Sequence, residues 1–318
     1  TAILQMINGF NSYAINEAVY YYTPLIFIIV YSQISDEQDV ETILNYLFVL
    51  YIIAFFKNFA GQLTLANIKS ISFANSYSPF ESELAFVFLI FECFYLYMGK
   101  RKKAIISLIL CILSFKRICM LVAISFFVLS KWLIQKKPVS KKMFFATVII
   151  FVLLPTLTCV MLNDAFEAWF YQTFHITLYE ATLSRSSRIE AVMNSGQIKY
   201  GLGSVTTYLT RYLNTMHGSN FASRSMHNDL VQMYLECGIL GSIVFTYIYM
   251  KAASVNRMSF ALICYVFFEC YFNHLFGAGC THIWVLIYLM MSITGMTTRN
   301  GENDGEENGK NNGLYTDI

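Results

Sequence analysis

The sequence has little charge: only 13% of its 318 residues are Asp, Glu, Lys or Arg, whereas 56% are hydrophobic. A soluble domain carries about 25% charged residues, and a chain this apolar cannot bury its side chains and still present a polar surface. The mean hydropathy is +0.51, while intrinsic disorder requires low hydrophobicity and high net charge. The composition therefore predicts a polytopic membrane protein, and apolar runs long enough to cross a bilayer make all-α the expected fold class.

The sequence also lacks the patterns of several other classes. Its net charge is only +2, which gives no indication of a nucleic-acid partner. The eight cysteines stand singly, with no CxxC pair and no metal-ligand spacing, so we expect packing residues rather than disulfides or a metal site. There is no cleavable signal pattern and no internal repeat, and because the chain starts at Thr1 we expect an N-terminal truncation.

Candidate membrane spans are apolar runs that could cross about 30 Å of hydrocarbon. Nine such runs lie at 18–31, 42–60, 83–98, 104–116, 118–134, 143–162, 229–250, 258–275 and 281–297.

Two basic clusters set the orientation of these spans. They occupy 100–103 and 131–142, and clusters of this kind stay in the cytoplasm. Because both ends of 104–134 are then cytoplasmic, this segment is expected to cross twice, as a hairpin whose tip at 114–117 reaches the outer face.

Counting spans from the hairpin divides the chain into four parts. The N-terminal membrane helices occupy 1–162, a long external loop follows at 163–228, and further membrane helices occupy 229–297. The polar, Gly/Asn/Glu-rich segment 298–318 is expected to be a disordered cytoplasmic tail.

Two arginine positions are candidates for binding an anion. Arg117 stands at the hairpin tip, where an arginine costs about 2.5–3.5 kcal/mol at bilayer depth unless it snorkels to the interface. In the loop, Ser187 and Glu190 have the S-x-x-E spacing of a capping box, which predicts a helix beginning at Arg188. Free N–H groups beside this guanidinium, with Arg185 just before it, favour a phosphate. The alternative is an ordinary solvated helix.

Two further stretches carry polar or glycine residues. Gly201 and Gly203 allow either a sharp turn or a close backbone approach to a ligand. His227 lies at the outer mouth of the span 229–250, where a neutral imidazole could act as a general base near pH 7. In that span, Glu236 is expected to be protonated or hydrogen-bonded to a neighbouring helix.

Glycines in the same span have a structural interpretation. Gly238 and Gly241 would allow close packing against another helix. Glu92 and Glu269 lie within other spans, where a polar interior, proton binding and structural hydrogen bonding are all open alternatives.

Taken in order, these motifs resemble one family. They are Ser-Phe-Lys-Arg117, Ser-Arg188-Ile-Glu, Gly-Leu-Gly203, and His227-Asn-Asp-Leu followed by Glu236-Cys-Gly-Ile-Leu-Gly241. Together they resemble the O-antigen polymerase and O-antigen ligase superfamily of Gram-negative inner membranes, over roughly 83–297. Within that superfamily the chain looks closest to O-antigen polymerase.

The resemblance implies glycosyl transfer at the periplasmic face, with 163–228 as a periplasmic loop. The donor would be a glycan linked to undecaprenyl pyrophosphate, and no cofactor and no metal are implied. Arg117 and Arg188 would hold the pyrophosphate from opposite sides, and His227 would deprotonate or orient the attacking hydroxyl. Additional substrate contacts are expected from Arg185, Gly201, Gly203, Arg211, Arg224 and Asn228. Expected partners are membrane lipid and a chain-length regulator and flippase of the same pathway.

Three alternatives stay open at this point. An O-antigen ligase shares these motifs but transfers the glycan to lipid A-core. A lipid-linked oligosaccharide flippase or transporter could use the intramembrane Glu92, Glu236 and Glu269 for ion coupling, although such proteins often have internal repeats. A structural assembly subunit would not need Arg117, Arg188 and His227 at one level of the membrane.

Overall fold

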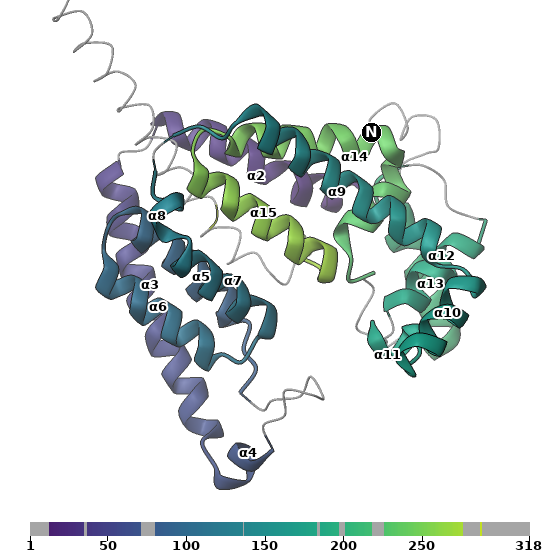
Figure 1. Cartoon of the computed structure of the whole chain (residues 1–318), viewed down its shortest axis with the longest axis horizontal. Helices are drawn as coiled ribbons and strands as arrows, with labels where there is room; N and C mark the ends of the chain where they lie inside the picture. Colours follow the sequence, from purple (N-terminus) through teal and green to yellow (C-terminus); the bar gives the residue numbers. More distant parts are fainter. Residues whose placement is uncertain are drawn as a thin grey trace, which may run out of the picture. The chain divides into compact units, whose positions relative to one another are not determined.

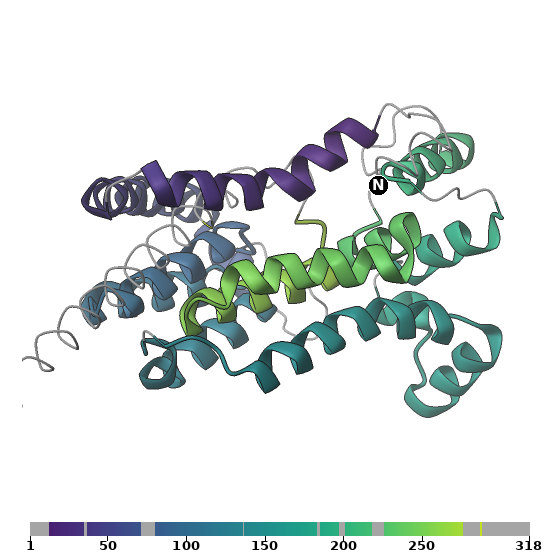
Figure 2. The same cartoon turned by 90° about the horizontal axis from the view of Figure 1, so that it is seen from above.

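The computed structural model describes residues 13–34, 37–70, 80–135, 137–182, 185–196, 201–217, 226–275 and 287. Over these residues every regular element is a helix (Figure 1, Figure 2), as the composition predicts. The helices are α2 (Ala14–Ile34), α3 (Glu37–Gln62), α4 (Leu65–Lys69), α5 (Leu84–Tyr97), α6 (Arg101–Leu113), α7 (Arg117–Val128), α8 (Ser130–Leu133), α9 (Lys141–Met161), α10 (Asp164–Phe174), α11 (Leu178–Ala181), α12 (Arg185–Asn194), α13 (Ser204–His217), α14 (Asp229–Ala253) and α15 (Arg257–Phe272).

Three of these helices are long and apolar enough to cross a membrane. They are Gln38–Gln62 within α3, and the whole of α9 and α14. Each exposes large apolar side chains, for example Ile53, Val160 and Leu240, the last with 75% of its surface exposed. Exposed apolar surface of this extent is typical of contact with lipid or another protein, and it supports a membrane location.

The other expected spans are only partly matched. Helices α5, α6 and α7 coincide with expected spans but have 14, 13 and 12 residues, fewer than the roughly 20 that one straight crossing needs. The ninth span and the tail lie outside the described residues, apart from Ile287. The nine-span topology therefore stays a prediction.

The chain forms two compact units. The first contains the described residues within Thr1–Leu25, Ser140–Ala252 and Ile263–Thr281, and the second those within Ile26–Val139, Ala253–Leu262 and His282–Ile318.

The second unit is built around α5, whose side chains from Ala85 to Tyr97 are all buried. The Phe91 ring of α5 lies 5.1 Å from that of Phe48 on α3. Helix α6 ends at Leu113 and α7 begins at Arg117, so residues 114–116 form the turn between them. The hairpin tip predicted from the sequence, 114–117, lies at the same place.

The first unit packs α2, α9, α14 and α15 through aromatic side chains. The centroid of the Phe245 ring on α14 lies 5.6 Å from the ring centroid of Tyr21 on α2 and 5.7 Å from that of Phe267 on α15. Phe267 in turn lies 5.4 Å from Phe151 of α9. Aromatic pairs at such distances stabilise by about 0.5–1.5 kcal/mol beyond the area they bury. These contacts order the helices on which the candidate site is built.

The loop between α9 and α14 is itself helical and carries α10 to α13 (Figure 1). An apolar cluster joins α12 and α13 to the beginning of α14, and its buried members are Ile189, Val192, Val205, Leu209, Met226 and Val231. Cys159 of α9 and Tyr271 of α15 pack against this cluster. The cluster therefore fixes α12 and α13 beside one end of the helices in the first unit.

Candidate functional site

Two arginines of α12 point toward the packed side of that helix. With 3.6 residues per turn, Arg185, Arg188, Ile189 and Val192 fall within an arc of about 100°. Ile189 and Val192 are buried in the apolar cluster, so the arginines on the same face are partly shielded from solvent. Both Arg185 and Arg188 are consequently half-buried.

The expected start of α12 is wrong. The helix already includes Arg185, and its first turn contains Ser187, which therefore is not the N-cap. The hydroxyl of Thr182 accepts a hydrogen bond from the Ser186 N–H at 3.1 Å and so satisfies an early amide of the helix. Arg188 consequently lies one turn inside α12, and the anion-binding potential comes from its side chain rather than from a free helix N-terminus.

His227 lies two residues before the first residue of α14 and has a left-handed backbone, with φ 54°. Only a few per cent of non-glycine residues adopt positive φ. The next residue, Asn228, is buried, and its Oδ1 accepts from the Val231 N–H at 3.0 Å, which caps α14. The structure thus gives the side-chain oxygen of Asn228 a capping role, whereas the resemblance implied substrate binding.

A buried carboxylate and a second histidine accompany His227. Nδ1 of His274, which follows α15, is hydrogen-bonded to Oδ1 of Asp229, the first residue of α14. The Asp229 side chain is fully buried. The ring centroids of His227 and His274 lie 6.5 Å apart. Sequence reasoning did not pair Asp229 with His274, although both residues stand at ends of expected spans that face the same side.

The electrostatic environment keeps His227 neutral. Burial, followed by the charges of Arg188, His274 and Arg185, lowers the pKa of His227 to about 4. Burial also lowers the pKa of Arg188 and of Arg185, the latter with an added contribution from Arg188. Arginines remain charged at pH 7 even so. The site therefore combines a neutral imidazole with two half-buried cations.

A side-chain relay orients Arg185. Its Nη2 donates to Oδ1 of Asn273 at 3.4 Å, and Nδ2 of Asn273 donates to Oε2 of Glu269 at 2.6 Å. Glu269 is buried within α15. Among the alternatives open for this carboxylate, the structure shows structural hydrogen bonding.

The Gly201–Gly203 segment forms a turn whose N–H groups have partners inside the protein. The Gly203 N–H donates to Oε2 of Glu17 on α2 at 2.7 Å, and the Gly201 N–H donates to the Glu236 carbonyl at 2.7 Å. Glu17 also accepts from the Thr206 hydroxyl and from Nε2 of Gln232. These glycines therefore position the loop against α2 and α14, and both N–H groups are used in hydrogen bonds within the protein.

A kink at Gly238 shapes the middle of α14. Gly238 has φ 66° and ψ −178°, which interrupts the helix. Three residues on, a Cβ at Gly241 would lie 2.3 Å from Cβ of Cys237, so a side chain there would collide. Both glycines thus serve the bend of α14 itself, rather than the close helix packing that was expected. Glu236, just before the kink, accepts from the Val205 N–H at 3.0 Å, in agreement with the expected hydrogen bond to a neighbouring element.

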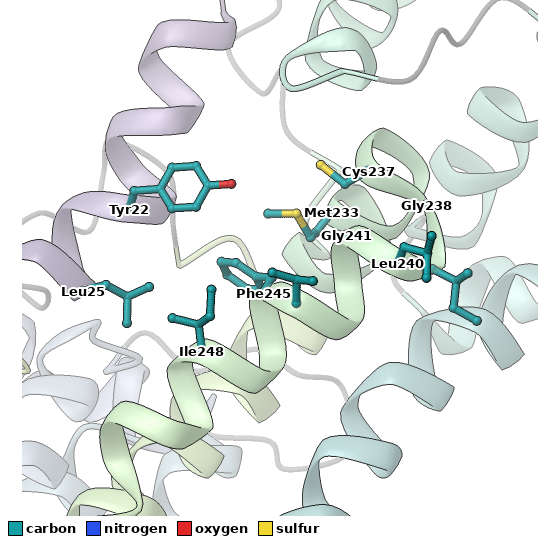
Figure 3. A pocket seen from close by; sticks show the side chains of 11 residues that line it. Tyr22, Leu25, Met233, Cys237, Gly238, Leu240, Gly241, Phe245 and Ile248 are labelled. Atoms are coloured by element: carbon teal, nitrogen blue, oxygen red, sulfur yellow. The ribbon is translucent and has the colours of Figure 1, made fainter. Parts of the chain in front are cut away.

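An apolar groove follows the kink within the first unit. It has a volume of about 590 Å³ and is lined by α2 and α14. Figure 3 shows Tyr22 and Leu25 of α2 facing Phe245 and Ile248 of α14 across it, with Cys237 at one end. The groove thus runs along the helix whose first residue is Asp229.

The remaining arginine candidates are not part of the cluster described in the first unit. Arg117 is the first residue of α7 and belongs to the second unit. Arg211 is exposed on α13, about 200° around the helix from the buried Leu209, so it faces away from the apolar cluster. Arg224 lies outside the described residues.

Over the described residues, no group of three His, Cys, Asp or Glu side chains is arranged to hold a metal ion. No family model, curated protein or solved structure matches this chain. The family resemblance therefore rests on the motifs quoted from the sequence.

Proposed function

We propose that this chain is a glycosyltransferase of the bacterial inner membrane, an O-antigen polymerase that joins repeat units carried on undecaprenyl pyrophosphate. In this proposal the nine expected segments span the membrane and the α10–α13 region lies in the periplasm. The observation that carries the proposal is the cluster of Arg185, Arg188 and a neutral His227 beside one end of α14.

The cations suit the leaving group of such a reaction. Breaking a glycosyl–pyrophosphate bond develops negative charge on the phosphate oxygens. Guanidinium groups bind these oxygens in bidentate geometry, and fixed charges aimed at developing charge act most strongly where water is excluded. Arg185 and Arg188 are half-buried, so their charges are less screened than those of surface arginines. A role for Arg117 in the same step remains a prediction from the sequence alone.

The neutral histidine suits the acceptor. A neutral imidazole can accept or orient the proton of a sugar hydroxyl, and general acid–base catalysis contributes about 10²–10⁴-fold. Because His227 is neutral at pH 7, it adds no charge that would compete with the arginines for the pyrophosphate.

The apolar groove suits the lipid carrier. Its lining residues include Leu25, Phe245 and Ile248, and α14 is one of the three helices able to cross a membrane. We assign the groove to part of the isoprenoid chain. A carrier lying there would follow α14 toward the end that bears Asp229, with its pyrophosphate toward the arginines.

A lipopolysaccharide gel tests the proposal. A strain that lacks the gene should show lipid A-core with a single repeat unit, and the wild-type gene should restore the ladder. Arg188→Lys and His227→Ala should fail to restore it at equal protein level. Bare core with carrier-linked polymer accumulating would instead indicate a ligase, and an unchanged ladder after deletion would contradict the proposal.

A further inference from the structure

The Asp229–His274 pair joins two elements that are far apart in the sequence. Asp229 opens α14, while His274 follows α15, and the hydrogen bond runs between Oδ1 and Nδ1. The side chain of Asp229 is fully buried, whereas that of His274 retains 29% of its exposure. The carboxylate is thus the inner member of the pair, and the imidazole is the member that solvent and substrate can reach.

This geometry selects one form of the imidazole. When Nδ1 donates to a carboxylate, its proton is held there, and Nε2 becomes the acceptor nitrogen of the ring. The carboxylate also stabilises the imidazolium that forms when Nε2 takes up a proton. In hydrolases with a Ser-His-Asp triad, the aspartate performs these same two tasks for the histidine that acts as general base.

His227 has different surroundings. Burial of its ring, followed by the charges of Arg188, His274 and Arg185, opposes the uptake of a proton. Its own partner of opposite charge, Asp229, is the residue that hydrogen-bonds to His274. Of the two rings, whose centroids are 6.5 Å apart, the one bound to the carboxylate is the better placed to become positively charged.

We propose that His274, oriented by Asp229, is the base that takes the proton of the acceptor hydroxyl, and that His227 orients that hydroxyl. This inference rests on the proposed glycosyltransferase function. It makes His274 a catalytic residue and Asp229 a positioning residue.

The step balances as follows. The acceptor hydroxyl oxygen forms a bond to the anomeric carbon of the donor glycan, and the bond from that carbon to the pyrophosphate oxygen breaks. The bonding electrons leave with undecaprenyl pyrophosphate, whose added charge faces Arg185 and Arg188. The hydroxyl proton passes to Nε2 of His274 and then to water.

The test is the pH dependence of chain elongation by the purified full-length protein in lipid nanodiscs. The substrate is the undecaprenyl-pyrophosphate-linked repeat unit extracted from a strain that lacks the gene. Among the described residues, the charged and titratable groups that act on the two rings are Asp229 and Glu17 for His274, and Arg185, Arg188 and Asp229 for His227. Of these, we vary the aspartate and the two histidines.

The expected wild-type rate falls on the acid side with a midpoint between about pH 5 and 8, where imidazoles ordinarily titrate. His274→Gln should lower the rate by about 10²–10⁴-fold and remove this acid limb. Asp229→Asn should lower the rate and move the limb to lower pH, because the carboxylate no longer favours the imidazolium. Asp229→Glu should retain the limb at its wild-type position.

The control is His175→Asn, since His175 is an exposed loop residue with φ 56° and asparagine tolerates a positive φ. It should keep the wild-type rate and profile, and equal melting temperatures would show that each variant is folded. A wild-type midpoint near pH 4 that vanishes in His227→Gln, with His274→Gln retaining near-normal rates, would overturn the inference while the proposed function stands. A wild-type protein that elongates nothing would overturn the proposed function itself.

Discussion

The bend in α14 depends on a backbone conformation at Gly238 that other residues adopt only at a cost in free energy. Gly238 has φ 66° and ψ −178°, a region of backbone conformation essentially restricted to glycine. An alanine there must either keep this conformation, at a cost of about 1–3 kcal/mol, or straighten the helix. Straightening would displace Glu236 and its two hydrogen bonds to Gly201 and Val205, each contributing about 1 kcal/mol. By either route, we expect Gly238→Ala to lower the unfolding free energy by about 1–3 kcal/mol.

Thermal unfolding of the purified protein in detergent measures this effect. At about 2–4 °C per kcal/mol for a chain somewhat smaller than this one, the melting temperature should fall by several degrees. The matched control is Gly61→Ala, because Gly61 lies in the regular helix α3 and a Cβ there meets nothing within 4 Å. The control should melt at the wild-type temperature or slightly above it. A Gly238→Ala protein as stable and as active as the wild type would refute the assigned role of the kink.

Three further predictions follow from the site. Lysine cannot form the bidentate hydrogen bonds of arginine, so Arg188→Lys should reduce the polymerisation rate by about 10²–10³-fold. The control Arg257→Lys, in the second unit, should not reduce it. Equal rates for the two variants would count against phosphate binding by Arg188. Because the folded-state pKa of His227 is about 4 and its usual value is 6.5, the folded protein binds fewer protons than the unfolded chain between these values. Stability should therefore decline as the pH falls from 6.5 to 4, and His227→Gln should flatten that decline in melting curves recorded across this range. The Glu17 carboxylate accepts hydrogen bonds from Gly203, Thr206 and Gln232. Glu17→Gln should therefore lower the unfolding free energy by about 1–3 kcal/mol in the same assay. An unchanged melting temperature would show that these hydrogen bonds do not stabilise the fold.

Much of the helical framework follows from local sequence. The apolar run expected at 143–162 corresponds to α9 at Lys141–Met161, and the one expected at 229–250 lies within α14. Such runs are bounded by charged or capping residues, so their limits are visible without any tertiary information. The start of α12 could not be predicted in this way. The S-x-x-E pattern indicates a helix start at Ser187, whereas in the structure the Thr182 hydroxyl accepts from the Ser186 N–H at an earlier start.

The candidate site depends more strongly on tertiary contacts. Sequence reasoning selected Arg188 and His227 from their motifs, and the structure places them close enough that the Arg188 charge helps to lower the pKa of His227. It could not pair Asp229 with His274, because 45 positions separate them and no local pattern records the contact. The same holds for Glu17, which stands at the beginning of the first apolar run and holds the Gly203 turn.

Transfer of a glycan from a pyrophosphate carrier, the function proposed for this chain, has a fixed stoichiometry that can be measured. Purified protein in nanodiscs, supplied only with undecaprenyl-pyrophosphate-linked repeat units and no added metal, should lengthen the glycan and release one undecaprenyl pyrophosphate for every glycosidic bond formed. Absence of chain growth, or growth without release of the carrier, would contradict the account.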